Sequence, residues 1–208
     1  MMWKYQQIRY QGYSQDLGTA IKKISLRSVR ENNESNIEIR KEYANWFVDV
    51  AYMKEKFIFI DESGFSISMR RLYRYSQINK KAIKNVQGIK TINYTIIAAL
   101  TIAGIFRFEV LDGPCNAIYF SLFINEILNH FEESNMINMI FVMDNVPFHH
   151  NHSIRESIER KGRTLKYLPP YSPYFNPIEN VFFQWKDFVR NKNPSNEEEL
   201  IRYIEHGE

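Results

Sequence analysis

The sequence predicts an α/β fold in which a mixed β-sheet is flanked by helices. Short β-type runs alternate with segments of helical period along the chain, which is the pattern of a layered α/β domain. Hydrophobic residues make up 44% and aromatic residues 15% of the 208 positions, so one substantial core can form. With only 8 Gly and 7 Pro, collagen-like and wholly disordered chains are excluded.

The first half of the chain contains one predicted helix and three predicted strands. Apolar residues recur at helical spacing from about Asn36 to Tyr52. The β-type run at 56–60 (KFIFI) meets a turn-forming cluster at 61–64 (DESG), so we expect the strand to stop there. Two β-type runs at 91–101 and 105–111 are separated by a short turn, which predicts a hairpin.

The second half continues with helices and strands in alternation. Asn116 is predicted to be the N-cap of a helix that runs to about Glu133, because apolar residues follow at three- and four-residue steps. The apolar run at 139–143 (MIFVM) is typical of a strand covered on both faces. The remaining expected elements are a helix at 153–161, a strand at 164–168, a helix at 178–190 and a tail helix from Glu197.

Charge is sorted along the chain, although the net charge is only +3. A basic segment at 70–90 holds seven Lys and Arg residues and no acid, interleaved with Tyr73 and Tyr75. Cationic side chains displace counterions from nucleic-acid phosphates, and aromatic rings stack on bases. The basic segment therefore suits contact with nucleic acid, and equally suits a solvated loop.

No part of the sequence is typical of a membrane or secreted protein. The longest apolar-rich stretch, at 91–106, is shorter than the roughly 18 residues of a spanning helix and carries polar side chains. Residues 1–10 offer no apolar core for a secretory signal, so we expect an intracellular protein. The single cysteine, Cys115, excludes an internal disulfide and indicates no thiolate metal site.

Three acidic residues stand where α/β proteins often place functional groups. Asp61 and Asp144 each follow a predicted strand, and Glu179 lies in the first turn of a predicted helix. If the two strands are parallel neighbours, the aspartates meet at the sheet edge where such folds bind ligands. Clustered carboxylates repel each other, and one or two Mg²⁺ or Mn²⁺ ions would compensate that repulsion and support attack on a phosphodiester. Taken singly, each acid also suits a turn or a helix cap.

The segments around these acids resemble one known family. FIFIDESGF at 57–65, MDN at 143–145 with His149, and LPPYSPYFNPIEN at 168–180 together resemble the DDE transposases of the mariner and bacterial insertion-sequence superfamily. The proline-rich segment, which enters a helix on an acidic residue, is the most specific of the three. The 34 residues between Asp144 and Glu179 also fit a spacing known in this superfamily.

The resemblance implies an RNase H-like fold, in which a mixed five-stranded sheet is flanked by helices. It implies an enzyme that hydrolyses DNA phosphodiesters and joins 3′ ends during transposition, with two Mg²⁺ or Mn²⁺ ions. The implied partners are DNA, as transposon ends and as target, and either a second copy of the chain or a full-length transposase. No membrane is expected to take part, and in a eukaryotic host the implied location is the nucleus.

The resemblance also implies roles for single residues. The catalytic, metal-binding carboxylates would be Asp61, Asp144 and Glu179. Accessory roles fall to the acid after the first aspartate and to two residues that shape the loop before Glu179, namely Glu62, Tyr171 and Asn176. The aromatic residues of the following helix are expected to face the core: Phe182, Phe183 and Trp185.

Contact with DNA is expected from residues of the basic segment and from the loop after the second aspartate. The expected arginines are Arg70, Arg71 and Arg74. Asn145 either orients the second aspartate or contacts DNA, and His149 is expected to contact DNA. A histidine metal site at 149–152 is disfavoured, since oxygen ligands suit magnesium better than imidazole does.

The expected organisation is a residual segment or linker at 1–36 and a catalytic domain at 37–208. Members of the family carry helix-turn-helix DNA-binding modules ahead of the catalytic domain, and the residues before Ile37 are too few for paired modules. Specific recognition of transposon ends is therefore not supported. Two other functions stay open: a catalytically inactive, transposase-derived DNA-binding or regulatory remnant, and a general RNase H-like nuclease for repair or RNA substrates.

Overall fold

The computed structural model describes residues 28, 30–52, 56–69, 77, 80, 93–136, 138–150 and 152–206. Most of the segment at 1–36 and, apart from Gln77 and Lys80, the basic segment at 70–90 lie outside the described residues. Arg70, Arg71 and Arg74 are among the residues that lie outside them.

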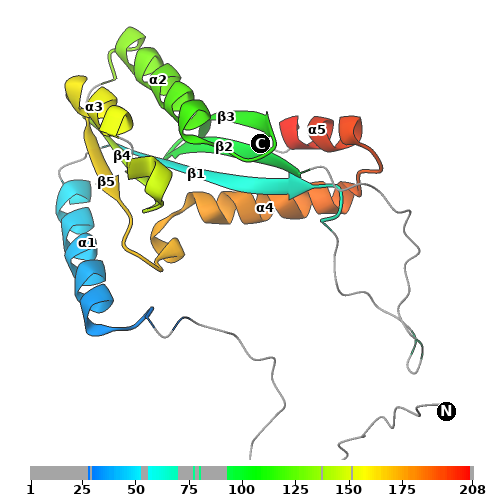
Figure 1. Ribbon diagram of the computed structural model, residues 1–208, viewed down its shortest axis with the longest axis horizontal. Coiled ribbons are helices and arrows are strands. Elements are labelled where there is room, and N and C mark those ends of the chain that lie inside the picture. Colours follow the sequence, from blue (N-terminus) through cyan, green and yellow to red (C-terminus); the bar gives the residue numbers. More distant parts are fainter. Residues whose placement is uncertain are drawn as a thin grey trace, which may run out of the picture.

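A mixed five-stranded sheet in the order β3-β2-β1-β4-β5 forms the centre of the fold (Figure 1). The strand β1 (Lys56–Ser66) pairs antiparallel with β2 (Asn93–Thr101), which pairs antiparallel with β3 (Gly104–Asp112). On its other side β1 pairs parallel with β4 (Met139–Met143), and β4 pairs parallel with β5 (Thr164–Tyr167). The expected mixed five-stranded sheet is confirmed.

Helices cover both faces of the sheet. The described helices are α1 (Glu34–Tyr52), α2 (Ala117–Glu133), α3 (His152–Arg160), α4 (Ile178–Lys192) and α5 (Glu197–Glu205), with 3₁₀ turns η1 (Pro147–His150) and η2 (Pro173–Phe175). Residues of α1, α4 and α5 pack on one face, and residues of α2 and α3 pack on the other (Figure 1). No helix in the described ranges is long and apolar enough to cross a membrane.

The sequence placed the end of β1 too early. Its parallel pairing with β4 does end at Ile60, opposite Met143. Its antiparallel pairing with β2, however, continues to Ser66. The β2 backbone therefore supplies hydrogen-bond partners for the expected turn cluster at 61–64, and Asp61 lies within the strand rather than after it.

Alternation along β1 assigns its side chains to two separate cores. Ile58 and Ile60 belong to the core beneath α2 and α3, whereas Phe59 and Phe65 belong to the core beneath α1, α4 and α5. Successive side chains of a strand point to opposite faces. Odd-numbered positions of β1 thus face α4 and even-numbered positions face α2, so neighbouring residues at 61 and 62 serve opposite sides of the sheet.

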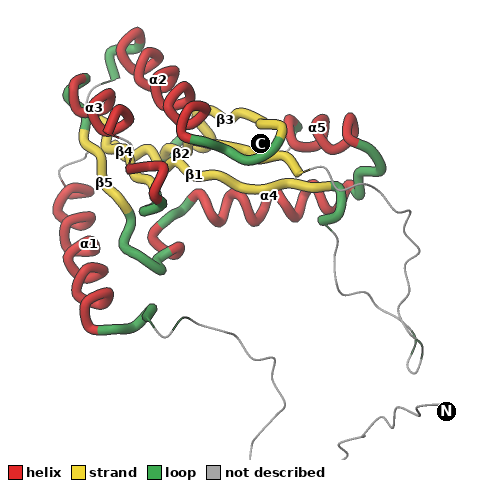
Figure 2. Tube along the Cα trace, viewed as in Figure 1, coloured by secondary structure: helices red, strands yellow, loops and turns green. Residues whose placement is uncertain are grey.

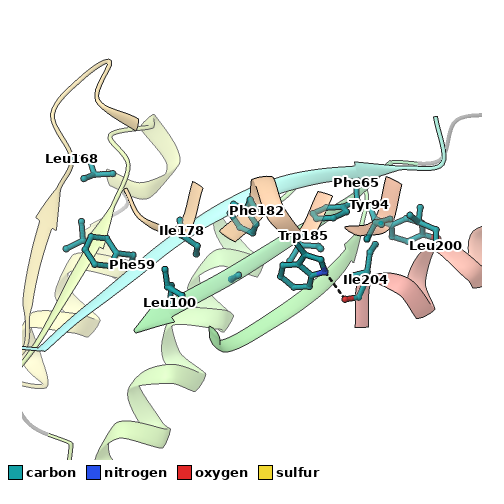
Figure 3. Packing of buried hydrophobic residues seen from close by; sticks show 14 of the residues in the cluster. Phe59, Phe65, Tyr94, Leu100, Leu168, Ile178, Phe182, Trp185, Leu200 and Ile204 are labelled. Carbon is teal, nitrogen blue, oxygen red and sulfur yellow. Dashed lines mark hydrogen bonds between the residues drawn. The ribbon is translucent and has the colours of Figure 1, made fainter. Parts of the chain in front are cut away.

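Trp185 lies at the centre of the core beneath α4 (Figure 3). Its ring centroid is 5.8 Å from that of Phe65 in β1 and 5.1 Å from that of Phe108 in β3. The indole Nε1 donates a buried 2.9 Å hydrogen bond to the carbonyl oxygen of Ile204 in α5. One side chain therefore fixes α4 against both the sheet and the last helix.

The expectation for the aromatic residues of α4 is confirmed in two cases and wrong in one. Phe182 and Trp185 are buried, but Phe183 is 67% exposed. The buried positions of α4 follow helical spacing, at Ile178, Phe182, Trp185 and Val189, and position 183 lies outside that stripe.

Candidate active site

Asp61 and Asp144 come from neighbouring parallel strands. The residues before them, Ile60 and Met143, are partners in the parallel register of β1 and β4. The two aspartates therefore occupy equivalent positions at the carboxyl edge of the parallel strands, where α/β sheets bind ligands. The aspartate of β1 is buried, at 8% exposed, while the side chain of the second is 37% exposed.

The proline-rich loop carries the chain from β5 to α4 along the same edge (Figure 2). The main-chain N–H of Leu168 donates to the carbonyl oxygen of Met143 at 2.9 Å, which holds the start of the loop beside β4. Tyr171 adopts a left-handed backbone with φ of 55°, an unusual conformation for a residue other than glycine. Pro177 then precedes α4 with φ of −62°, a value suited to helix entry, and Glu179 lies in the first turn.

The three carboxylate side chains line one cavity of about 400 Å³. Six residues that the sequence singles out line it: Asp61, Asp144, Glu179, Asn145, Tyr171 and Asn176. Asn145 also lines a smaller cavity of about 220 Å³ that reaches α1 at Tyr43. The accessory positions Tyr171 and Asn176 thus belong to the walls of the same site as the acids.

Asp61 is a buried carboxyl group with both oxygens in hydrogen bonds. Oδ1 accepts from the main-chain N–H of Glu62 at 2.7 Å, and Oδ2 accepts from Nδ2 of Asn176 at 2.9 Å. Burial raises the pKa of Asp61 to about 7, against the main-chain hydrogen bond, and the charges of Asp144, Glu62 and Glu179 act in the same direction as burial. Asn176 of the proline-rich loop therefore contacts Asp61 directly, in addition to shaping the loop that leads to α4.

His149 links Asp144 to the opposite face of β1. Its ring is fully buried, with Nε2 3.1 Å from Oε1 of Glu62 and Nδ1 2.6 Å from Oδ1 of Asp144. Burial acts to lower the pKa of His149, but the neighbouring carboxylates of Asp144 and Glu62 outweigh it and raise the pKa to about 9. The buried ring offers no exposed surface to a phosphate or a base, so the structure does not support the expected contact between this histidine and DNA.

Sequence reasoning missed one cation near the acids. Lys186 lies on α4 seven residues after Glu179, and its Nζ is 5.7 Å from the centroid of the Phe65 ring. Burial lowers the pKa of Lys186, and the charges of Glu179 and Asp61 counteract that effect. Two helical turns place positions 179 and 186 on one side of the helix, and this spacing was the signal that could have found it.

The acids are not gathered into a closed ligand set. Among the residues that the structure describes, no group of three or more His, Cys, Asp or Glu side chains is close enough to hold a metal ion. Asp61, Asp144 and Glu179 instead face one shared cavity and interact through their charges. The fold and this cavity define an α/β domain with an acidic site at the carboxyl edge of its parallel strands.

The family to which the chain belongs follows from a comparison with family models. The model described as DDE superfamily endonuclease matches residues 56–201, which is well over half of the chain. The chain belongs to the DDE superfamily of endonucleases. A comparison with curated proteins gave no match.

Solved structures of the Mos1 mariner transposase share the fold. A Mos1 paired-end complex with the left transposon end has a TM-score of 0.73 at 17% identity, covering 92% of this chain and 59% of that one. A Mos1 paired-end complex with Mn has a TM-score of 0.64 at 16% identity, covering 91% and 64%. The Mos1 catalytic domain has a TM-score of 0.51 at 16% identity, covering 83% and 88%. The expected RNase H-like fold is confirmed, and the chain spans 59% of the first of these Mos1 chains.

Proposed function

We propose that this chain is the catalytic domain of a DDE transposase, which cuts DNA phosphodiesters and joins the resulting 3′ ends to target DNA with Mg²⁺ or Mn²⁺. One observation carries the proposal: carboxylates from β1, from the end of β4 and from the first turn of α4 line one cavity. The Mos1 structures that share the fold are described as complexes with a transposon end, with Mn and with Mg. These descriptions support DNA as substrate and a divalent cation as cofactor.

The chemistry of the cavity suits a hard divalent cation. Its three acidic side chains offer carboxylate oxygens, which are the ligands that Mg²⁺ and Mn²⁺ prefer. The charges of Asp144 and Glu179 add to burial in raising the pKa of Asp61, and a bound cation would favour the ionised form. These three residues line one cavity without forming a closed ligand set, so we propose that their side chains draw together around the metal, and that two ions bind.

The metal, when bound, would activate the attacking oxygen and offset charge on the leaving oxygen. The protein's own contribution is orientation. The main-chain N–H of Glu62 and the amide of Asn176 hold both oxygens of Asp61, and the proline-rich loop sets the place of Glu179. Holding the reacting groups in position lowers the entropic cost of reaching the transition state.

The proposed reaction has two steps of the same kind. In the first, a water oxygen bonds to phosphorus as the bond to the 3′ oxygen breaks, and the leaving oxygen takes a proton, so that a 3′-hydroxyl and a 5′-phosphate result. In the second, the oxygen of that 3′-hydroxyl loses its proton and bonds to a phosphorus of the target strand, and the 3′ oxygen displaced there takes a proton. Both steps need charge stabilisation at one phosphate, which one acidic cavity with its cations can supply.

We also propose how DNA and protein partners bind. Asn145, at the cavity wall, would contact the strand next to the reacting phosphate. Arg70, Arg71 and Arg74 would contact backbone phosphates, since cationic side chains that follow β1 in sequence suit that role. A second copy of the chain or a full-length transposase is the proposed protein partner.

A plasmid nicking assay tests the proposed chemistry. The purified chain is incubated with supercoiled plasmid and Mg²⁺ or Mn²⁺, alongside Asp144→Asn and, as a matched control, Asp49→Asn on the exposed face of α1. We expect nicking by the wild-type chain and by the Asp49 variant, loss of nicking in the Asp144 variant, and loss of all nicking in EDTA. Equal nicking by the wild-type chain and Asp144→Asn would overturn the proposal.

Joining of a labelled oligonucleotide 3′ end to plasmid separates the proposed function from its alternatives. Nicking together with joining supports a transposase domain. Nicking without joining would assign the chain to the general RNase H-like nucleases. DNA binding without cleavage in Mn²⁺ would assign it to the inactive, transposase-derived remnants.

A further inference from the structure

We infer that His149 is a positioning residue, which holds the Asp144 carboxylate in the orientation that the cavity requires and is itself anchored by Glu62. The inference rests on the proposed function, because it assigns a task toward a proposed metal-binding carboxylate. It gives a role to the second acid of the Asp61-Glu62 pair and to a histidine that does not line the cavity.

The anchor comes from alternation in β1. Asp61 faces α4, where Asn176 donates to it, whereas Glu62 faces the side of α2. The Glu62 side chain is only 14% exposed, and its Oε1 lies 3.1 Å from Nε2 of His149. Two adjacent acids thus serve one site from both faces of the sheet, the first at the cavity and the second behind it.

The histidine ring is held on several sides. It stacks on Phe120 of α2 with a centroid separation of 4.1 Å and an interplanar angle of 29°. The Tyr167 hydroxyl of β5 donates to the carbonyl oxygen of His149 at 2.8 Å, which fixes its backbone. These contacts restrict the movement of the fully buried ring, and partners restricted in this way keep ligand side chains in place.

The consequence for Asp144 is that its two oxygens have different surroundings. Oδ1 lies 2.6 Å from Nδ1 of His149 and is shielded from solvent, although it has no hydrogen bond of good geometry, so this contact is chiefly electrostatic. Nδ1 is also 3.2 Å from the main-chain oxygen of Asp144. The Asp144 side chain as a whole is 37% exposed and lines the cavity. One carboxylate oxygen therefore contacts the histidine, and the other is available to the cavity.

Calorimetric titration of the purified full chain with Mn²⁺ measures its affinity for the cation and tests this inference without relying on activity. The variants are His149→Ala, His149→Asn and His149→Gln, with His130→Ala of α2 as the matched control, because His130 packs on Phe106 away from the cavity. An Asn amide reaches as far as Nδ1 and retains a donor toward Asp144, whereas a Gln amide reaches toward Glu62. We expect His149→Ala to weaken Mn²⁺ binding by about 10- to 100-fold, with His149→Asn closer to wild type than His149→Gln.

Nicking at increasing Mn²⁺ concentration gives a second readout. A positioning role predicts that excess Mn²⁺ restores part of the rate of His149→Ala, whereas a purely structural defect is not restored by the cation. Glu62→Gln, which keeps the shape of the side chain, is expected to weaken Mn²⁺ binding in the same direction, and it carries the test if His149→Ala does not fold.

The outcomes distinguish a failure of the role inferred for His149 from a failure of the proposed function. Unchanged Mn²⁺ affinity in folded His149→Ala or in Glu62→Gln, with a wild-type chain that binds Mn²⁺ and nicks DNA, would overturn the inference alone. Equal losses in the Asn, Gln and Ala variants without rescue by Mn²⁺ would also overturn it. A wild-type chain that neither binds Mn²⁺ nor nicks DNA would overturn the proposed function and this inference with it.

Discussion

The amide of Asn176 donates a 2.9 Å hydrogen bond to Oδ2 of Asp61, although the two residues lie 115 positions apart in the sequence. Asn176 is 3% exposed and has an extended backbone with φ of −109° and ψ of 97°, the conformation favoured before a proline. The residue therefore ties the entrance of α4 to β1 at the acid itself. The same Asn-Pro step that starts the helix of Glu179 also orients the first aspartate.

Asn176→Ala is expected to lower both stability and nicking. The substitution removes the donor to a buried carboxyl group, which costs about 1 to 3 kcal/mol of unfolding free energy. Loss of orientation at Asp61 should reduce nicking by about 10-fold or more. Urea unfolding and the plasmid assay measure the two effects, with the exposed Asn180→Ala as control. Equal stability and activity in the two variants would contradict the assigned role of the hydrogen bond.

Two of the three acids, Asp144 and Glu179, are visible in the sequence because each is attached to a local pattern. Asp144 directly follows the apolar strand β4, and Glu179 follows a loop whose prolines limit how the chain can enter a helix. Asp61 lies beside Asp144 because β1 and β4 are parallel neighbours. The sequence alone shows only that the two aspartates would meet if the strands paired in this way. The family resemblance implied this strand arrangement, and the parallel pairing of β1 with β4 confirms it.

The parts that the sequence does not reveal depend on contacts between distant segments. The cluster after residue 60 has turn-forming residues, yet pairing with β2 keeps it extended to Ser66. The family resemblance implied a DNA contact for His149, whereas packing against Phe120 buries its ring. Burial of a polar side chain follows from partners across the sheet, and no local pattern around position 149 encodes Glu62 as that partner.

Trp185→Phe is expected to destabilise the domain through one hydrogen bond and a small loss of volume. The indole N–H is the donor to the buried carbonyl oxygen of Ile204, and phenylalanine leaves that oxygen without it. The expected cost is about 1 to 3 kcal/mol in urea unfolding. Phe183→Ala, at an exposed position two residues away, should change stability by no more than about 0.5 kcal/mol. A smaller effect at 185 than at 183 would refute this account of how α4 is held.

Tyr43→Phe is expected to leave the domain as stable as before or to stabilise it by up to about 1 kcal/mol. The Tyr43 hydroxyl is buried without a hydrogen-bond partner, and burial raises its pKa. Removing an unsatisfied buried polar group eliminates a desolvation cost. The ring contacts with Trp46 and Phe175, at 5.3 and 5.2 Å between centroids, are retained.

The ring, rather than the hydroxyl, should account for what Tyr43 contributes. Tyr43→Ala removes the contacts with α1 and η2 and should cost about 3 kcal/mol or more in the same unfolding experiment. A loss above 1 kcal/mol in Tyr43→Phe would instead show that the hydroxyl has a partner in solution.

Cys115 is expected to react slowly with iodoacetamide across the neutral and mildly alkaline range. Burial and the charge of Glu62 raise the pKa of the Cys115 thiol to about 12. The thiolate is the reactive form, so a thiol with a raised pKa keeps its proton, and stays unreactive, between its ordinary pKa near 9 and the raised value. At pH 8.5 the folded chain should react on the order of 100-fold more slowly than the chain in urea, and its rate should still rise above pH 10. Mass spectrometry of timed samples measures both rates. A rate that levels off near pH 9 in the folded chain would show an ordinary thiol pKa. It would place Cys115 in a more solvated setting than its position directly before Asn116, the N-cap of α2, provides.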